Sequence, residues 1–109
     1  MLDHNRESLL VVYQQALDAV NGQRCVRDYL NNASLNTEQY IIAIGKAAPA
    51  MMQGAIPYLA KGLVITRHGY GQGLFDSDDR ICLIESGHPV PDESSLGAGN
   101  ALIKFISEL

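Results

Sequence analysis

The feature that most constrains the fold is an apolar run that changes abruptly into a helical pattern. Residues 39–44 form a nearly continuous apolar run of strand length, which favours a strand buried on both faces in a parallel sheet. From Gly45 onward the apolar spacing becomes helical, and a second strand is predicted at residues 63–66. Because a helix connects them, these two strands should be parallel and joined by a right-handed crossover.

Three further helices are predicted from apolar residues that recur every three or four positions. One precedes Asn21-Gly22, one follows it, and one closes the chain. The predicted apolar faces are Leu9, Val12, Tyr13, Ala16, Leu17 and Val20 in the first helix; Cys25, Val26, Tyr29 and Leu30 in the second; Met51, Ala55 and Leu59, beside Met52 and Ile56, after Gly45; and Ala98, Ala101, Leu102, Phe105 and Leu109 in the last. Pro57 should end or kink the helix after Gly45. Residues 81–84 are predicted as a third strand, whose direction stays open because its connection is short.

This order of elements predicts an α/β fold, a three-layer Rossmann-like sandwich with a mainly parallel sheet that is incomplete in this chain. A sheet of three strands is small against the usual ~5–6. The last helix reaches Leu109 without a Gly, Asn or Pro stop signal. We therefore expect residues 1–109 to be one part of a longer domain.

Charge and composition exclude two classes of function. Eight Lys and Arg against twelve Asp and Glu give a net charge of -4, and the chain has no basic cluster that could neutralise nucleic-acid phosphates. The apolar stretch 40–52 is interrupted by Gly, Lys and Pro, so it is far shorter than the ~20 residues of a membrane span. The first residues lack the features of a signal peptide, and Cys25 and Cys82 are interpreted as free thiols. We expect a cytoplasmic protein.

The common phosphate, cofactor and metal motifs are absent. Gly45-Lys46 is followed by Ala47, where a Walker A loop needs Ser or Thr. The glycines in residues 69–73 alternate, but no helix follows them as the dinucleotide fingerprint requires. Residues 76–80 begin like a calcium loop, yet an arginine replaces a ligand, which favours a solvated turn. No His or Cys set has zinc spacing, so no metal site is predicted.

Lys46 is the strongest catalytic candidate. It lies just beyond the carboxyl end of the first predicted strand, at the edge where open α/β sheets bind ligands. A helix N-terminus attracts anions, so a lysine there is locally unfavourable and indicates a functional role. A solvated lysine whose stem lies along the helix is the alternative reading.

A second candidate constellation lies in residues 85–95. Two prolines at alternate positions stiffen this connector, and Asp92 or Ser94 can cap the last helix. A rigid connector with its cap is the simpler interpretation for these two residues. His88, before Pro89, could instead hydrogen-bond an anionic substrate. Arg67 and His68, at the end of the second strand, are similar candidates, whereas Ser86 has no neighbouring base that would support a nucleophilic role.

Several of these strings resemble the type II glycerate 2-kinases, the family whose C-terminal half is called MOFRL. The resemblance rests on residues 44–48 (Ile-Gly-Lys-Ala-Ala) followed by Met51, and on residues 87–92 (Gly-His-Pro-Val-Pro-Asp) with Ser94 or Ser95. Residues 63–67 and the glycines after them, and the opening helix, are also similar. The likeness covers essentially all 109 residues.

The resemblance implies phosphoryl transfer from ATP to the 2-hydroxyl of D-glycerate, giving 2-phosphoglycerate, with Mg²⁺ as the divalent metal of the full-length enzyme. Family members place the active site between an N-terminal α/β domain and the MOFRL half, which this chain lacks. The lysine that matches Lys46 is the proposed catalytic residue, and it is paired with an arginine of the second half. We therefore expect this chain alone to bind ligands poorly, to hold no cofactor tightly and to turn over nothing measurable.

The predicted site consists of Lys46 as the catalytic residue and Gly45, Arg67, Ser86, Gly87, His88 and Asp92 as substrate-binding residues. Two alternatives stay open. Proteins that resemble this chain are often labelled hydroxypyruvate reductases, although the nicotinamide fingerprint is missing. A non-catalytic module, truncated or degenerate, is the other. Its open sheet edges would favour association with a second copy or with the missing half.

Overall fold

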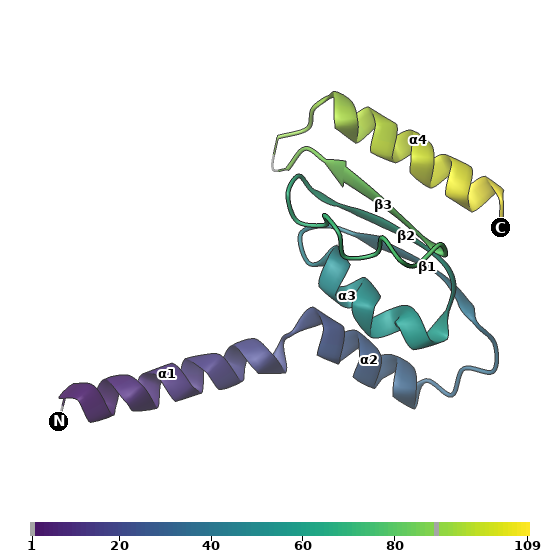
Figure 1. The fold of residues 1–109 in the computed structure, drawn as a ribbon. Coiled ribbons are helices and arrows are strands. Elements are labelled where there is room, and N and C mark those ends of the chain that lie inside the picture. The colour runs from purple at the N-terminus through teal and green to yellow at the C-terminus, as the bar shows by residue number, and fades with distance from the viewer. Residues whose placement is uncertain (1, 89) are drawn as a thin grey trace.

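The computed structural model describes residues 2–88 and 90–109, and its elements follow the predicted order (Figure 1). They are α1 (Leu2–Ala19), α2 (Gly22–Asn32), β1 (Gln39–Ile44), α3 (Ala48–Ala55), the 3-10 turn η1 (Ile56–Tyr58), β2 (Leu59–Arg67), β3 (Ile81–Ser86) and α4 (Glu93–Ser107). None of the helices in this described part is long and apolar enough to cross a membrane.

The three strands form one parallel sheet in the order β1-β2-β3. Leu63 pairs with Ile42 on one side, and Ile65 pairs with Ile84 on the other. The prediction of a parallel β1–β2 pair is confirmed, and β3, whose direction the sequence left open, is parallel as well.

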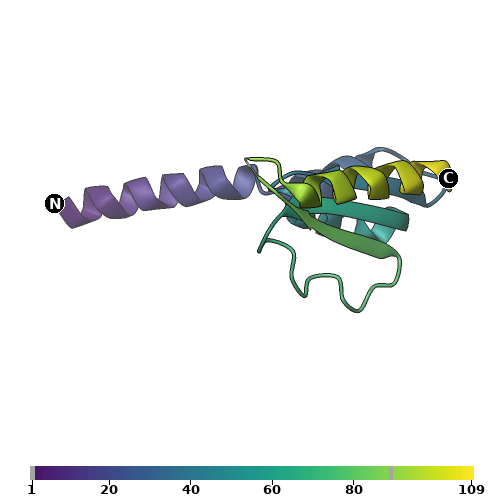
Figure 2. The same ribbon diagram turned by 90° about the horizontal axis from the view of Figure 1, so that it is seen from above.

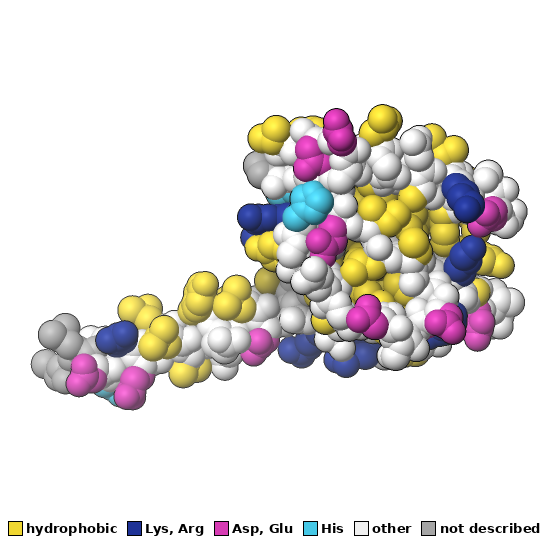
Figure 3. Space-filling view, turned by 45° about the horizontal axis from the view of Figure 1, so that its top comes forward, with side chains coloured by type: hydrophobic (Ala, Val, Ile, Leu, Met, Phe, Trp, Pro, Cys, Tyr) yellow, Lys and Arg dark blue, Asp and Glu magenta, His cyan; other side chains and the backbone are white. Residues whose placement is uncertain are grey.

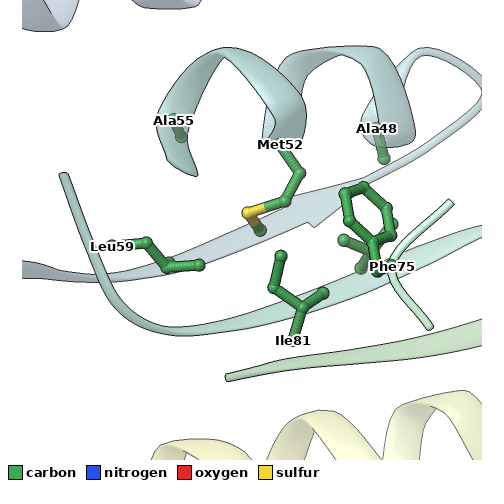
Figure 4. Packing of buried hydrophobic residues seen from close by; sticks show 7 residues of the cluster. Ala48, Met52, Ala55, Leu59, Phe75 and Ile81 are labelled. Carbon is green, nitrogen blue, oxygen red and sulfur yellow. The ribbon is translucent and has the colours of Figure 1, made fainter. Parts of the chain in front are cut away.

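Helices cover both faces of the sheet, so the fold has three layers (Figures 1 and 2). On one face, Met52 of α3 is fully buried against Leu59, Val64, Phe75 and Ile81, and α2 packs behind α3 (Figure 4). On the other face, Ala98 and Phe105 of α4 pack on Leu63 and Ile65. The predicted α/β sandwich with a parallel sheet is confirmed.

The helix after Gly45 is shorter than its apolar pattern indicates. Pro57 lies in η1, as the predicted helix end requires, and the chain enters β2 at Leu59 rather than at residue 63. Leu59 therefore belongs to a strand and not to the α3 face, because the chain has already left the helix before it. Met51 lies next to Gly22 of α2 and is 42% exposed, while the neighbouring Met52 fills the core.

The prediction that β1 is buried on both faces is wrong. Its side chains alternate between half-buried and exposed, and Tyr40 and Ile44 are about three-fifths exposed, at 58% and 61%. The physical reason is position: β1 is an edge strand, and α4 packs on β2 and β3. Full burial on both faces belongs to the central strand β2, where residues 62–66 are all buried.

The predicted apolar stripe of the first helix, its face from Leu9 to Val20, does not pack against the α/β body. The helix extends away from the α/β body, and apolar side chains lie exposed along it (Figures 1 and 3). Leu9 is 71% and Val20 is 73% exposed. In α2 only Val26 and Leu30 of the predicted face pack against the core, since Cys25 and Tyr29 are exposed.

The last helix follows its predicted face except at its end. Ala98 and Phe105 are buried and Leu102 packs against them. The helix ends at Ser107, so Leu109 lies beyond it and is 61% exposed rather than buried.

Candidate active site

The carboxyl ends of the three parallel strands meet at one edge of the sheet, which is where ligands bind in open α/β folds. A small pocket of about 110 Å³ lies at this edge. Its lining residues come from all three strand ends: Ile44, Gly45, Ile65, Thr66, Arg67, Ser86, Gly87 and His88. Five of the seven predicted site residues are therefore brought together, and the other two, Lys46 and Asp92, adjoin this group.

Lys46 follows β1 directly but lies outside the helix. Gly45 takes a φ of +125°, a region that favours glycine, and its N–H donates to the Ile65 carbonyl at 2.9 Å. The helix α3 begins at Ala48 with Ala47 as its N-cap, so Lys46 lies just before the helix N-terminus at which it was predicted. The Lys46 side chain is exposed beside Tyr70, with Nζ 5.7 Å from the ring centre.

Arg67 reaches the same tyrosine through a tight turn. The Tyr70 N–H donates to the Arg67 carbonyl at 3.1 Å, and Gly69 between them has a φ of +85°. This turn folds the ring back, so that it lies 5.0 Å from the Arg67 guanidinium carbon. Nη1 of Arg67 also donates to the Tyr70 hydroxyl at 3.4 Å. Sequence reasoning missed Tyr70, although its place between Gly69 and Gly71 was a signal for a turn next to Arg67.

The two cations are not neutralised within the described part of the chain. Lys46 and Arg67 take part in none of the ion pairs found there, all of which lie elsewhere. Two positive side chains therefore gather around one aromatic ring at the ligand-binding edge. An anion is the ligand chemistry that this arrangement attracts.

His68 connects this edge to the start of α4. Its Nε2 lies 3.3 Å from Oδ2 of Asp92 and 3.1 Å from Oγ of Ser94, and its Nδ1 lies 3.9 Å from Oε2 of Glu85. Glu85 Oε2 also accepts from the Gly69 N–H at 3.1 Å. The turn that carries Tyr70 is thus fixed to β3 and to α4 through side chains.

Asp92 caps α4, as its simpler interpretation predicted. Its Oδ1 accepts from the Ser94 N–H at 2.8 Å. Its side chain also accepts from the Ser95 N–H while its own N–H donates to Oγ of Ser95 at 3.1 Å, and these two bonds form a capping box. The Ser94 hydroxyl, the Ser94 N–H and His68 hold the pKa of the Asp92 carboxyl below its usual value, against the opposing effect of desolvation.

The remaining predicted residues differ in what they do. Ser86 is buried and its hydroxyl donates to Oγ of Ser95 at 3.2 Å, so it ties β3 to α4. A side chain at Gly87 would place Cβ 2.6 Å from the Val90 carbonyl oxygen, so only glycine fits there. His88 is exposed at the rim of the pocket. The sequence analysis places His88 before Pro89, but Pro89 lies outside the described ranges.

Thr66 is a buried polar residue at this pocket that the sequence analysis did not single out. Thr66 is 2% exposed, and its hydroxyl has no hydrogen-bond partner among the described residues. Across residues 2–88 and 90–109, no three His, Cys, Asp or Glu side chains gather in a way that could hold a metal ion. At this edge the described structure has two cations, Lys46 and Arg67, which can bind phosphate or carboxylate oxygens, and the carboxylates of Glu85 and Asp92, which lie beside His68.

Comparison with known proteins places the chain in a family. Residues 8–109 match the family described as a domain of unknown function, DUF4147. The chain belongs to the DUF4147 family. Curated relatives support the resemblance of this chain to the N-terminal portion of the glycerate 2-kinases, which was drawn from the sequence.

Two of these relatives are named as kinases. The chain is 29% identical over 102 residues to the D-glycerate 2-kinase of Thermotoga maritima, covering 90% of this chain and 24% of the relative. It is 47% identical over 66 residues to the glycerate 2-kinase of Pyrococcus horikoshii, covering 58% of this chain and 14% of the relative. The chain thus spans about a quarter or less of the length of these relatives.

A solved structure shows the same fold. The crystal structure of the PH0495 protein from Pyrococcus horikoshii superimposes with a TM-score of 0.72 at 29% sequence identity. The match covers 95% of this chain and 26% of that protein.

Proposed function

We propose that this chain is the N-terminal portion of an ATP-dependent glycerate 2-kinase. In the proposed reaction the γ-phosphorus of ATP forms a bond to the 2-hydroxyl oxygen of D-glycerate while its bond to ADP breaks. The hydroxyl proton leaves, and the products are 2-phosphoglycerate and ADP. The curated relatives named as glycerate 2-kinases support the family, and the arrangement of side chains supports the chemistry.

The observation that carries the proposal is the pair of cations at the carboxyl edge of the sheet. Lys46 and Arg67 both lie beside Tyr70 and take part in none of the ion pairs of the described structure. Phosphoryl transfer depends on positioning and on positive charge where the phosphoryl oxygens gather charge. Lys46 would stabilise the transferring phosphoryl group, and Arg67 would bind the glycerate carboxylate.

The pocket residues would form the wall that orients the substrate. Gly45 and Gly87 allow the backbone to approach the ligand closely, and Ser86 is held by Ser95 so that this wall is rigid. Asp92 would act mainly through the cap of α4 and through His68, while His88 at the rim is free to contact the substrate. ATP would supply the phosphoryl group and Mg²⁺ would neutralise its oxygens.

The residues of this chain supply only part of the proposed site. The described residues provide the cations but no cluster of metal ligands. We propose that the metal travels with the nucleotide and that the partner arginine lies in the MOFRL half. The chain alone is then expected to bind glycerate and ATP weakly and to show no measurable turnover.

One observation favours a second candidate, a non-catalytic module that acts by association. The exposed apolar side chains of α1 and the outward face of β1 are surfaces that such a module would use. Its partner would be a second copy or the missing half. This candidate predicts association without chemistry.

The test compares reactions in the protein encoded by the open reading frame that contains these residues. With D-glycerate, ATP and Mg²⁺ we expect 2-phosphoglycerate, detected by ³¹P NMR. With hydroxypyruvate and NADH we expect no change in absorbance. NADH oxidation without phosphoryl transfer would show that the protein is a reductase and not a kinase. If neither reaction occurred, the result would favour the non-catalytic module.

A further inference from the structure

Tyr70 is placed so that its ring contacts both cations of the candidate site. Lys46 Nζ lies 5.7 Å and the Arg67 guanidinium carbon 5.0 Å from the ring centre. Both distances are within the range of about 6 Å in which a cation is attracted by the negative face of an aromatic ring. The cations come from different strands, Lys46 after β1 and Arg67 at the end of β2. One side chain therefore joins two strand ends.

Two like charges would otherwise move apart. Lysine and arginine have long, flexible side chains that lose rotamer entropy when they are fixed, and their charges repel each other. In the described structure neither of them is held by an ion pair with a carboxylate. The ring is the neutral group that attracts both, and it does so without cancelling the charge that an anion would bind.

The ring itself is fixed by its backbone. The Arg67–Tyr70 turn is closed by a hydrogen bond of 3.1 Å, and the Gly69 N–H within it donates to the Glu85 carboxylate of β3. Tyr70 is 41% exposed and belongs to neither hydrophobic cluster, so burial in the core does not explain its position. Its ring contacts the two cations.

We propose that Tyr70 is a positioning residue that holds Lys46 and Arg67 together as one binding site for an anionic oxygen group. The site takes phosphate or carboxylate oxygens, and the two cations are arranged before the anion arrives. Arrangement before binding lowers the entropic cost of association. The kinetic consequence of this role rests on the proposed kinase function, whereas the arrangement and the anion affinity do not.

The first experiment measures the arrangement in the 109-residue chain by NMR. A ring close to a cation shifts the side-chain protons beside that charge upfield. We expect upfield shifts of the Lys46 ε-methylene and Arg67 δ-methylene protons in the wild type and in Tyr70→Phe, and their loss in Tyr70→Leu. Tyr29→Leu removes an exposed tyrosine of α2 and is the matched control. Unchanged shifts in Tyr70→Leu would overturn the proposal.

The second experiment measures anion affinity with inorganic phosphate as the probe. We expect the dissociation constant to rise by about 3- to 10-fold in Tyr70→Leu and to change by less than about 2-fold in Tyr70→Phe and Tyr29→Leu. Backbone amide shifts outside residues 67–71 should stay in place, which shows that each variant is folded. Equal phosphate affinity in Tyr70→Leu and Tyr70→Phe would also overturn the proposal.

The outcomes separate this proposal from the proposed function. If the encoded protein transfers no phosphoryl group, the kinase assignment fails while the ring shifts and the phosphate affinity still test Tyr70. If it is a kinase, Tyr70→Leu is expected to raise KM for D-glycerate more than Tyr70→Phe does, because only the leucine loses the ring.

Discussion

At the residue scale, Gly69 controls where Tyr70 lies. Its φ of +85° is costly for any residue with a side chain, while an added Cβ would meet no described atom within 4 Å. We expect Gly69→Ala to lower the free energy of unfolding by about 1–2 kcal/mol through backbone strain alone. Gly69→Asn is the control, because asparagine tolerates this conformation better. Urea denaturation measures both, and equal losses in the two variants would contradict this explanation.

Asp92 makes the stability of the folded chain depend on pH, and the sign of this dependence follows from its lowered pKa. Because its pKa is lower in the folded chain, the folded state is stabilised above the ordinary aspartate pKa of about 3.9. That stabilisation is lost as the pH falls through the lowered pKa. We expect the Tm of the wild type to fall more between about pH 5 and pH 2.5 than the Tm of Asp92→Asn, which retains a cap but cannot be protonated. Parallel Tm curves for the two proteins would contradict this.

Individual residues also show where sequence reasoning succeeds. Asp92 as a cap follows from local chemistry, since an N-cap and its partner lie within three residues. The edge position of Lys46 follows from the order of strand and helix. The role of Tyr70 could not be found in this way: the flanking glycines indicate a turn, but the contact with Lys46 depends on the end of another strand.

At the element scale, alanine substitutions of two helix glycines are expected to change the stability of the chain in opposite directions. At Gly54 of α3 an added Cβ would lie 2.1 Å from the Gln23 carbonyl oxygen of α2, whereas no described atom lies within 4 Å at Gly97 of α4. Gly54→Ala should therefore force α2 away and cost about 1–3 kcal/mol. Gly97→Ala should stabilise the chain by about 0.5–1 kcal/mol through helix propensity. Thermal unfolding of both variants checks this, and a stabilising Gly54→Ala would show that α2 does not pack as described.

Elements were predicted well where the signal is local and poorly where it depends on neighbours. The strand–helix–strand order and the end of α3 just before Pro57 follow from the pattern of apolar residues and prolines. Burial on both faces was assigned to β1, but it belongs to β2, because the position of a strand in the sheet is decided by pairing and not by its own composition. The apolar stripe of α1 predicts a helix correctly, but it does not predict which part of the structure, if any, packs against that stripe.

At the scale of the whole molecule, the exposed stripe of α1 should cause association. Leu9 and Val12 are 71% and 62% exposed, so a charge there should not disturb the α/β body. We expect light scattering to show concentration-dependent self-association of the chain, reduced in the double variant Leu9→Glu/Val12→Glu with its Tm unchanged. A monomer at all concentrations would contradict this expectation.

The central claim is that Lys46 supplies the positive charge for phosphoryl transfer to D-glycerate. The measurement that tests it most directly compares the rates of 2-phosphoglycerate formation by the encoded protein and by its Lys46→Ala and Lys104→Ala variants. Lys104 is an exposed lysine in the last turn of α4 and serves as the matched control. We predict that Lys46→Ala lowers kcat by about 100-fold or more and that Lys104→Ala leaves it within about 2-fold. Equal rates for wild type and Lys46→Ala would contradict the account.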